Sequence, residues 1–479
     1  MSAYTDIQQY YLYEKDSKKQ LWLEGRCLEE HSFVVGKRYD RTIEEGVMTL
    51  TLSDVGRYVV SKKKVGGKEV PVLDIVNKQL TEAFENTVAI QIAYKGDSIT
   101  VTKSEVDRKI ERRERSFMAA LNSGQPLNWG SFYHGAGILD GGLHEGFERS
   151  ALPAHVSLAV ELDRRYMDIS CRNNTFWAPN AVRMSSPMEL LAFNSSKSTQ
   201  LHGICAGVPC TAASKSGRSK HKSMFEDASL PEANEKAGAQ IFYFLDVVNR
   251  CNPALAIVEN VNEWFASASY MIARTVLKMA GYTVYTRTVR GADFGALEDR
   301  ERTIMLAISR GLVKKVPFDF ATMVPRIAKP ANLAEVLIDT PDDSDAWSTC
   351  DYLIEKEKSD IATGKGFRLQ WVDPTSATKV GTIGRGYQKR RSTEVQIRHA
   401  ANPDLVRLLW PVEHARCKTI PERAIAGVEG LTLAHQVLGQ SVVREWFVSL
   451  GIAIGEWADQ LKLEFYSAKN DEVQYKLAI

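Results

Sequence analysis

The chain has 479 residues, a formal net charge of +2, and 44% hydrophobic and 25% charged residues. These values are typical of a globular protein with two or three domains. They exclude a membrane-spanning protein, because no apolar run approaches the roughly 18–20 residues that cross a bilayer. The N-terminus lacks the basic and apolar regions of a signal peptide. Seven mostly distant cysteines argue against a disulfide framework. We therefore expect a cytoplasmic location, no membrane partner and no metal site.

Residues 1–122 are predicted to form a β-rich accessory domain that ends in a helix. Residues 48–52 and 88–92 alternate between apolar and polar side chains, as half-buried strands do. Gly66 and Gly67 predict a turn between strands over 61–64 and 70–73. A helix is expected over 104–121, capped by Ser104 with Asp107. No internal repeat is visible in the sequence.

Residues 128–310 alternate between short apolar runs and helical patterns. Strands are predicted over 131–133, 156–162, 203–206 and 254–258. This rhythm is typical of a parallel, doubly wound α/β sheet, in which sites lie at the carboxyl ends of the strands. Residues 311–425 break the rhythm, and helical spacing completes the chain over 426–479.

Two side chains with reactive potential end apolar runs. Cys210 follows Pro209, and a thiolate is well suited to conjugate addition to an electron-poor ring. Glu259 ends an apolar strand, where partial desolvation favours a protonated carboxyl that can act on a base nitrogen. The alternative for Cys210 is a buried structural thiol, which is the fate expected for Cys205 and Cys251.

Two arginines and a glycine-rich turn add to this pattern. Arg300 and Arg302 can donate to a carbonyl oxygen or support Glu259, unless they form surface ion pairs with their acidic neighbours. Gly135 and Gly137 precede a helical segment over 139–147, which lets a cofactor approach the backbone. Glu161, at a strand end, can accept hydrogen bonds from ribose hydroxyls. An ordinary turn and a solvated charge are the competing interpretations.

Taken together, these segments resemble the cytosine-5 DNA methyltransferase family over about residues 128–460. The matching segments follow the family's motif order, and they are Tyr133-His134-Gly135-Ala136-Gly137, Glu161, Gly207-Val208-Pro209-Cys210, Glu259-Asn260-Val261, Gly295 to Arg302, Arg407 to Pro421 and Gln436 to Val442. The chain departs from the family at several positions: Tyr133 replaces Phe, Thr211 and Glu298 each replace Gln, and Gln440 replaces Asn. No acidic residue for the cofactor adenine is evident near 183–188.

The resemblance implies a Rossmann-like doubly wound methyltransferase core, an inserted target-recognition domain over 311–425 and an extra β-rich N-terminal domain. It implies S-adenosylmethionine as cofactor, bound by Tyr133, Gly135, Gly137, Glu161, Pro209, Gln440 and Ser441. Catalysis would rest on Cys210, Glu259, Arg300 and Arg302, with Cys210 attacking C6 of a flipped-out cytosine. Double-stranded DNA would be contacted by Ser214, Arg218, Arg385, Lys389, Arg390 and Arg391. A cognate restriction endonuclease is a further candidate partner.

Two other functions stay open at this point. An RNA cytosine-5 methyltransferase would share the motifs, although its members usually lack a substantial recognition domain. A catalytically silent DNA-binding relative would keep the fold without turnover. In the N-terminal region, residues 21–26 with 33–36 and 45–46 resemble AbrB-like swapped-hairpin modules, many of which bind DNA. The alternative for that region is a protein-interaction or dimerisation module.

Overall fold

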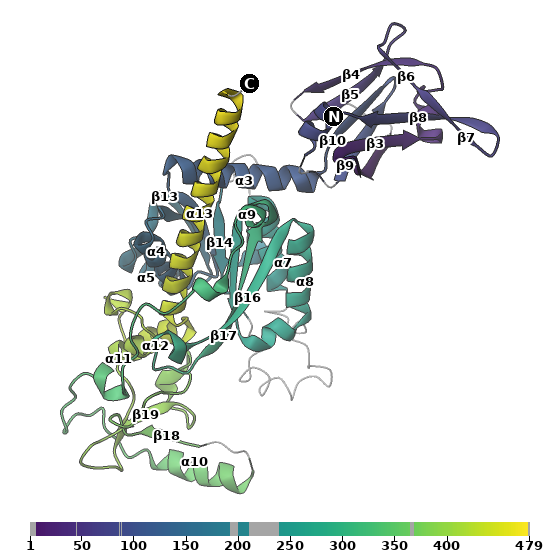
Figure 1. Cartoon of the computed structure of the whole chain (residues 1–479). Helices are drawn as coiled ribbons and strands as arrows, with labels where there is room; N and C mark the ends of the chain where they lie inside the picture. Colours follow the sequence, from purple (N-terminus) through teal and green to yellow (C-terminus); the bar gives the residue numbers. More distant parts are fainter. Residues whose placement is uncertain are drawn as a thin grey trace. The chain divides into compact units, whose positions relative to one another are not determined.

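The computed structural model describes residues 6–44, 46–85, 87, 89–191, 200–209, 239–364 and 368–477 (Figure 1). Its contacts divide the chain into two compact units, Met1–Arg112 and Arg113–Ile479. The division falls inside helix α3 (Glu105–Ser123), whereas the sequence suggested a boundary at its end. The expected cap is present, because the Ser104 hydroxyl accepts the Asp107 backbone N–H at 3.1 Å.

The first unit contains two antiparallel sheets around its own core. The strands are β1 (Asp6–Tyr11), β2 (Tyr13–Lys15), β3 (Lys18–Glu24), β4 (Arg38–Glu44), β5 (Val47–Leu52), β6 (Tyr58–Val59), β7 (Ser61–Val65), β8 (Lys68–Val76), β9 (Ala89–Lys95) and β10 (Ser98–Lys103). Helices α1 (Arg26–Glu30) and α2 (Lys78–Ala83) follow β3 and β8. One sheet has the order β1-β9-β10-β5-β4-β6, and the other has the order β2-β3-β8-β7.

These two sheets reveal an internal two-fold repeat. Residues 6–52 form three strands, a helix and a hairpin, and residues 58–103 form the same series. Replacing each strand by its equivalent in the other repeat gives the same two sheet orders, reversed. For example, β1 pairs with β9 of the other repeat, and its equivalent β6 pairs with β4. The register agrees: Leu21 faces Ile75 while Leu23 faces Leu73. The expectation that the chain has no repeat is therefore wrong.

The repeat is hidden in the sequence because the two copies share their pattern of burial and few identities. Equivalent core positions carry different apolar residues in several cases, such as Met48 with Ile99 and Leu50 with Val101, all fully buried. Burial constrains only size and polarity at such positions, so the side chains differ while the packing persists. Each repeat also lends strands to the other, so neither closes a sheet by itself.

The second unit is built on a seven-stranded sheet. Its strands are β11 (Leu127–Phe132), β12 (Ala154–Glu161), β13 (Trp177–Ser185), β14 (Gly203–Ala206), β15 (Leu255–Asn260), β16 (Tyr282–Arg290) and β17 (Glu301–Ser309). The order is β13-β12-β11-β14-β15-β17-β16. Strand β17 runs antiparallel to both its neighbours, so the expectation of an all-parallel sheet is corrected here.

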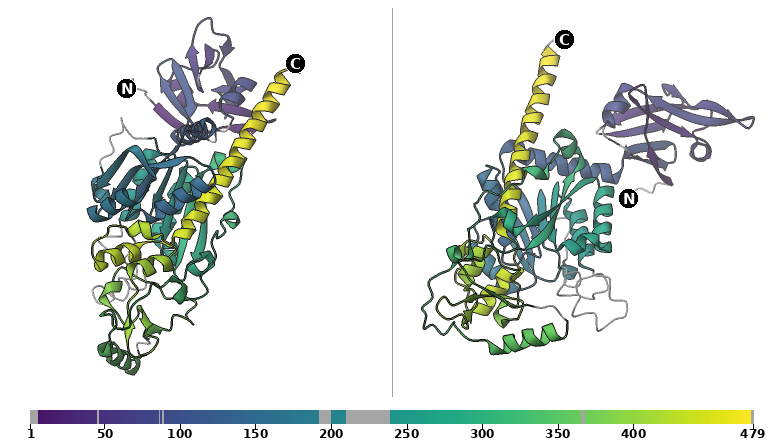
Figure 2. Two further views of the ribbon diagram at one scale, coloured as in Figure 1. Left: turned by 90° about the vertical axis from the view of Figure 1, so that its left-hand side faces the viewer. Right: turned by 60° about the horizontal axis from the view of Figure 1, so that its bottom comes forward.

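Helices cover both faces of this sheet, as a doubly wound fold requires (Figure 2). On one face, α3, α4 (Ile138–Arg149) and α13 (Arg444–Leu477) pack against Leu255 and Ile257. On the other face, α7 (Gln240–Cys251) and α8 (Ala268–Met279) pack against Ala256 and Val258. The alternating directions of these buried residues follow from the two-residue period of a strand. Helix α5 (Arg164–Asn173) lies between β12 and β13 in the chain.

The irregular region between the sheet and the last helices has a small core of its own. It contains α10 (Asp351–Ala362), the strands β18 (Gln370–Val372), β19 (Val395–Arg398) and β20 (Val406–Arg407), and α11 (Pro411–Cys417). Tyr387, Val395 and Ile397 belong to this core. By contrast, Leu312 and Met323, around helix α9 (Arg310–Lys315), pack into the core under the main sheet. The packing thus assigns the first residues after β17 to the sheet and its helices.

Helix α12 (Leu431–Gln440) precedes α13. Within the described ranges, no single helix has the length and apolar composition to cross a membrane, although α12 and the first part of α13 pass that test as a pair bent by 44°.

Candidate functional site

The segments singled out in the sequence lie along one edge of the seven-stranded sheet. Strands β11, β12, β14 and β15 are parallel, so their carboxyl ends share that edge. The sheet order reverses beside β11, which has β12 on one side and β14 on the other. Ligands of such sheets bind in the crevice at this reversal. The turn after β11 and residues 207–209 after β14 lie on either side of it.

The turn after β11 is held open by glycine geometry and a buried polar network. Tyr133, Gly135 and Gly137 all have positive φ, of 55°, 61° and 75°. A Cβ on Gly137 would lie 2.4 Å from the Ser170 hydroxyl oxygen, so this position needs glycine. A Cβ on Gly135 would meet no atom within 4 Å, so the backbone at Gly135 borders open space that a ligand can fill.

Beneath this turn, Asp140 organises the network. Its carboxylate accepts hydrogen bonds from the Ser131 hydroxyl at 2.7 Å and the Cys205 thiol at 3.1 Å, and lies 3.0 Å from His134 Nδ1. Burial opposes ionisation of Asp140, but His134, His144 and the Cys205 hydrogen bond together hold the pKa of the carboxyl below its ordinary value. This anchor was not found by sequence reasoning, because nothing in the pattern of α4 marks Asp140 as buried.

Glu161 reaches from the end of β12 to the same turn. One carboxylate oxygen accepts the Gly135 N–H at 2.6 Å, and the other accepts the Asp163 N–H at 2.9 Å. The Tyr133 hydroxyl donates to Gln240 at 3.0 Å, which fixes the ring at the far side of the turn. An acidic acceptor, an aromatic ring and open backbone therefore meet at this crevice.

The end of α12 joins these residues. Ala136, Tyr166 and Val437 pack in one buried cluster, and Gln440 Nε2 donates to the Tyr166 hydroxyl at 2.6 Å. The Ser441 hydroxyl donates to the Val437 carbonyl at 2.6 Å. Residues near the end of the chain thus complete the crevice that the turn after β11 begins.

Glu259 and Arg302 face one another because β17 is antiparallel to β15. In the register, Glu259 is opposite Ile304, which makes Arg302 its diagonal neighbour on the same face. The Arg302 Nε lies 3.2 Å from Glu259 Oε1, and the two side chains are 19% and 13% exposed. Burial and the nearby Arg300 lower the pKa of Arg302, while Glu259 opposes the shift. The reversal of one strand therefore supplies the partner of this carboxylate.

Asn260 links this pair to the strand before the cysteine motif. Its side-chain amide donates to the Val208 carbonyl at 3.1 Å, and its Oδ1 accepts the Val261 N–H at 2.8 Å. The amide is buried, so these bonds are shielded from water. They fix the backbone immediately before Pro209, whose ring is exposed.

Arg300 has surroundings unlike those of Arg302. It lies 3.2 Å from Glu298 and donates to the carbonyls of Ile383 and Gly439. Lys418 Nζ lies 3.5 Å from the other Glu298 oxygen, and all three charged side chains are at most 5% exposed. Burial opposes ionisation of Glu298, yet the two cations hold the pKa of its carboxyl below the ordinary value. Burial, assisted by Arg300, lowers the pKa of Lys418 to about 7.

This cluster explains why Glu298 stands where the family has Gln. The sequence did not identify Lys418 as a member of this cluster. The glutamate between arginines at 298–302 indicated an ion-pair cluster, but not its third member. Because Arg300 also holds the carbonyl of Ile383 in the irregular region and that of Gly439 in α12, the cluster fixes both against the sheet. We assign Arg300 this connecting contact; its predicted catalytic role stays a prediction.

Replacing Glu298 with Gln is expected to destabilise the second unit by about 3–5 kcal/mol, because two buried cations lose their anion. Urea unfolding of the full chain would measure the change. The double variant Glu298→Gln with Lys418→Met should recover part of the loss, and Glu422→Gln, in an exposed pair with Arg416, should cost little. A single variant as stable as the parent would contradict this assignment.

The cysteines inside the fold behave as structural groups. Burial raises the pKa of Cys205 well above its ordinary value and that of Cys251 to about 12. Both therefore stay protonated at neutral pH, as the sequence predicted for them. Cys210, together with Ser214 and Arg218, lies outside the described residues.

The basic residues of 385–391 differ in what they contact. Lys389, Arg385 and Arg391 are exposed. Arg390 instead turns inward, donating to the Ser348 hydroxyl, to Cys350 Sγ at 3.0 Å and to the Val406 carbonyl at 3.3 Å. The backbone at Gly384 and Arg385 touches α12 so closely that a Cβ on Gly439 would lie 2.3 Å from it. Only part of this predicted DNA-contacting run is therefore free to meet a ligand.

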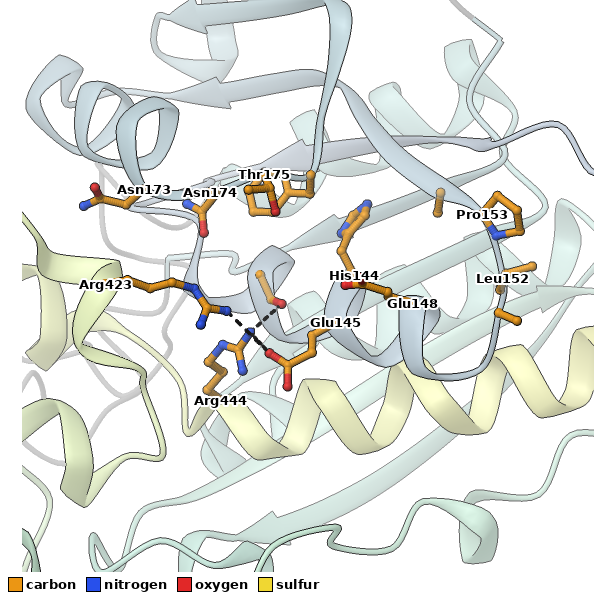
Figure 3. Close-up of a pocket in the computed structure, with 14 residues that line it drawn as sticks. His144, Glu145, Glu148, Leu152, Pro153, Asn173, Asn174, Thr175, Arg423 and Arg444 are labelled. Carbon is orange, nitrogen blue, oxygen red and sulfur yellow. Dashed lines mark hydrogen bonds and ion pairs between the residues drawn. The ribbon is translucent and has the colours of Figure 1, made fainter.

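A separate pocket lies beside α4 and α13, near the start of β12 and the end of α5 (Figure 3). Arg444 crosses it, 2.5 Å from Glu145 and 2.8 Å from the Gly141 carbonyl. Its lining includes Pro153 and Ala154, the first residue of β12, so the pocket is at the amino end of that strand. It shares no lining residue with the crevice described above.

Comparison with known proteins agrees with the motif order. The family model for C-5 cytosine-specific DNA methylase matches residues 135–456. The type II methyltransferase M.SsoII of Shigella sonnei is 25% identical over 245 residues, covering 50% of this chain and 60% of that protein. M.HhaI of Haemophilus parahaemolyticus is 26% identical over 197 residues, covering 39% and 51%. The matched stretches thus span 40% to 60% of the length of these and similar curated relatives.

A solved structure shows the same fold. The Dnmt2 methyltransferase of S. pombe superposes with a TM-score of 0.52 at 15% identity, covering 69% of this chain and 98% of that one. The mixed α/β sheet with helices on both faces is therefore a Rossmann-like methyltransferase fold.

Proposed function

Because this chain belongs to the C-5 cytosine-specific DNA methylase family, we propose that it transfers a methyl group to C5 of cytosine in double-stranded DNA. The observation that carries the proposal is the Glu259–Arg302 pair, 3.2 Å apart at the carboxyl end of β15. Asn260 ties this strand end to residue 208, two positions before Cys210. This link supports the proposal that Glu259 and the Cys210 thiol act on the same base.

In this proposal, each residue has a distinct role. The Cys210 thiolate adds to C6 of a cytosine turned out of the duplex, because C6 is inaccessible in the base stack. Glu259 holds a proton at N3, which stabilises the charge that the addition places on the ring. Arg302 orients Glu259. After C5 has gained the methyl group and lost its proton, the Cys210–C6 bond breaks and the thiolate leaves.

Several features around the turn after β11 support S-adenosylmethionine as the cofactor. When bound, this cofactor supplies the methyl group. Glu161 offers a carboxylate to ribose hydroxyls, Tyr133 offers a ring face, and the open backbone at Gly135 admits a close approach. Gln440 and Ser441 close the same crevice through the Tyr166 cluster. We propose these residues, with Gly137 and Pro209, as the cofactor site.

Incubating the purified chain with duplex DNA and tritiated S-adenosylmethionine tests the function directly. We expect label in DNA, and bisulfite sequencing of the product should locate it at cytosines within one sequence context. Label in RNA alone, in a parallel incubation with cellular RNA, would instead establish the RNA-directed alternative. Binding to DNA with no label in either substrate would indicate a catalytically silent relative.

We propose that the exposed cations Lys389 and Arg391 contact the DNA backbone. Replacing both with Ala should weaken binding and reduce the slope of log affinity against log salt by roughly 0.9 for each lost phosphate contact. Fluorescence anisotropy over a range of salt concentrations measures this slope. Arg390→Ala serves as the contrast: it should loosen the strand β20 contacts and lower thermal stability. An unchanged slope in the Lys389/Arg391 variant would leave these residues as solvated surface.

A second proposal concerns the first unit, as a further contact to duplex DNA. Two observations support it: the internal two-fold repeat, which resembles the local symmetry of a duplex, and the lysines 62–64 on the exposed edge strand β7. A dimerisation role is less well supported, because the two-fold pairing is already satisfied within one chain. A cognate restriction endonuclease remains a candidate partner on the strength of the type II relatives.

A further inference from the structure

Three metal-binding side chain types meet in the first unit. Cys27 and His31 lie four residues apart at the two ends of α1, so they project from the same side of the helix. Asp6, on strand β1, supplies the third group. Their ligand atoms all lie within 4.8 Å of one another, and the Asp6 carboxylate is 3.3 Å from the Cys27 sulfur.

The surrounding contacts hold these groups in place. Strand β1 is aligned by its pairing with β9, in which Asp6 faces Tyr94. The His31 ring stacks on that same tyrosine, with ring centroids 4.9 Å apart and an interplanar angle of 21°. Gln8 Nε2 donates to both Asp6 and Cys27 at 3.2 Å. The three groups are thus fixed by two independent elements, and His31 is buried.

The internal repeat provides a comparison within the same molecule. The position of Cys27 corresponds to Gln79 in α2, and that of His31 corresponds to Ala83, as the shared core residues Leu28 and Leu80 show. The i,i+4 ion pair Arg26–Glu30 likewise has its counterpart in Lys78–Glu82. The repeat therefore folds around α2 without cysteine or histidine. The fold does not require the cysteine and the histidine at α1, which points to a ligand as the reason for their presence.

We infer that Asp6, Cys27 and His31 bind one zinc ion that fastens strand β1 to helix α1. Thiolate, imidazole and carboxylate are the three ligand types of zinc sites, whereas calcium and magnesium require oxygen ligands. In a tetrahedral site the ligand atoms would be on the order of 3.5 Å apart. The Asp6–Cys27 distance of 3.3 Å is close to this value, and the other pairs lie within 4.8 Å. Binding exchanges the Cys27 thiol proton, released to solvent, for a Zn–S bond, and the two anionic ligands neutralise the ion. Water takes the fourth position.

The zinc content of the purified chain tests this inference directly. The full chain, stripped with a chelator and then dialysed against zinc, is expected to retain one ion by mass spectrometry of the metal. Cys27→Ser and His31→Ala should each weaken binding by more than the 10–100-fold typical of changes next to a metal ligand. The fold should tolerate His31→Ala, because Ala83 occupies the equivalent position in the other repeat. Two control variants should retain zinc fully. Gln79→Ser changes the position in α2 that is equivalent to Cys27, and Cys171→Ser removes another half-buried thiol.

Cobalt substitution gives a second readout that does not depend on stability. The cobalt-loaded chain should show the charge-transfer absorption of a thiolate–cobalt bond, absent in Cys27→Ser and present in Cys171→Ser. Retention of no zinc by the parent chain would overturn the inference. So would zinc binding that is equal in the parent, Cys27→Ser and His31→Ala.

Discussion

Cys210→Ser is expected to transfer no measurable methyl group to DNA while still binding DNA and S-adenosylmethionine. The proposed reaction begins with addition of a thiolate to C6, and a serine hydroxyl is a far weaker nucleophile at neutral pH. Binding should persist, because serine is nearly the same size as cysteine and the substitution leaves every residue proposed for the cofactor and for DNA unchanged. Transfer of radiolabel and equilibrium binding measure the two properties separately.

The same variant tests the covalent step. Duplex DNA carrying 5-fluorocytosine should form a stable adduct with the parent chain that survives denaturing electrophoresis, and Cys210→Ser should form none. Cys171→Ser is the control, since it removes a half-buried thiol that is not among the proposed site residues. Normal turnover by Cys210→Ser would refute the assignment of the nucleophile.

Glu259→Gln should lower the turnover rate by about 10²–10⁴-fold, the range typical of losing a positioned acid or base. Glutamine preserves the shape and can still accept a hydrogen bond from Arg302, so the fold and DNA affinity should change little. Single-turnover rates at saturating DNA would separate chemistry from binding.

A carboxylate nearby on the chain provides the control for this second prediction. Glu263 acts on Arg302 electrostatically but less strongly than Glu259. Glu263→Gln should therefore reduce the rate far less. Comparable losses in both variants, or a loss in affinity as large as the loss in rate, would mean that Glu259 serves the structure of the strand end instead of the reaction.

Much of the catalytic fold could be predicted because its strands are fully buried. The runs at 203–206 and 254–258 are apolar, so both strands could be predicted. The structure places β14 at Gly203–Ala206 as expected, and it extends β15 two residues further, over Leu255–Asn260. The side of the sheet carrying the site followed from the parallel rhythm. The direction of β17 could not be predicted, because the apolar pattern of a strand is the same for either direction of the chain. That direction is what brings Arg302 to Glu259.

Features that depend on long-range partners escaped the sequence. The burial of Glu298 depends on Lys418, more than a hundred positions later, and no local pattern connects them. The difference between Arg390 and its basic neighbours also depends on distant groups, the Ser348 hydroxyl and the Val406 carbonyl. In a run of like residues, composition alone assigns them the same role.

The repeat in the first unit has a consequence for how that unit can evolve. In a symmetric dimer of two identical chains, every substitution occurs twice, so each surface feature of one chain is repeated on the other. Here both halves are encoded in one chain, and a change in one leaves the other untouched. The run of three lysines on β7 and the Cys27 and His31 side chains at α1 each occur on one half only. A repeat within one chain can thus keep a symmetric framework while its two halves carry different side chains.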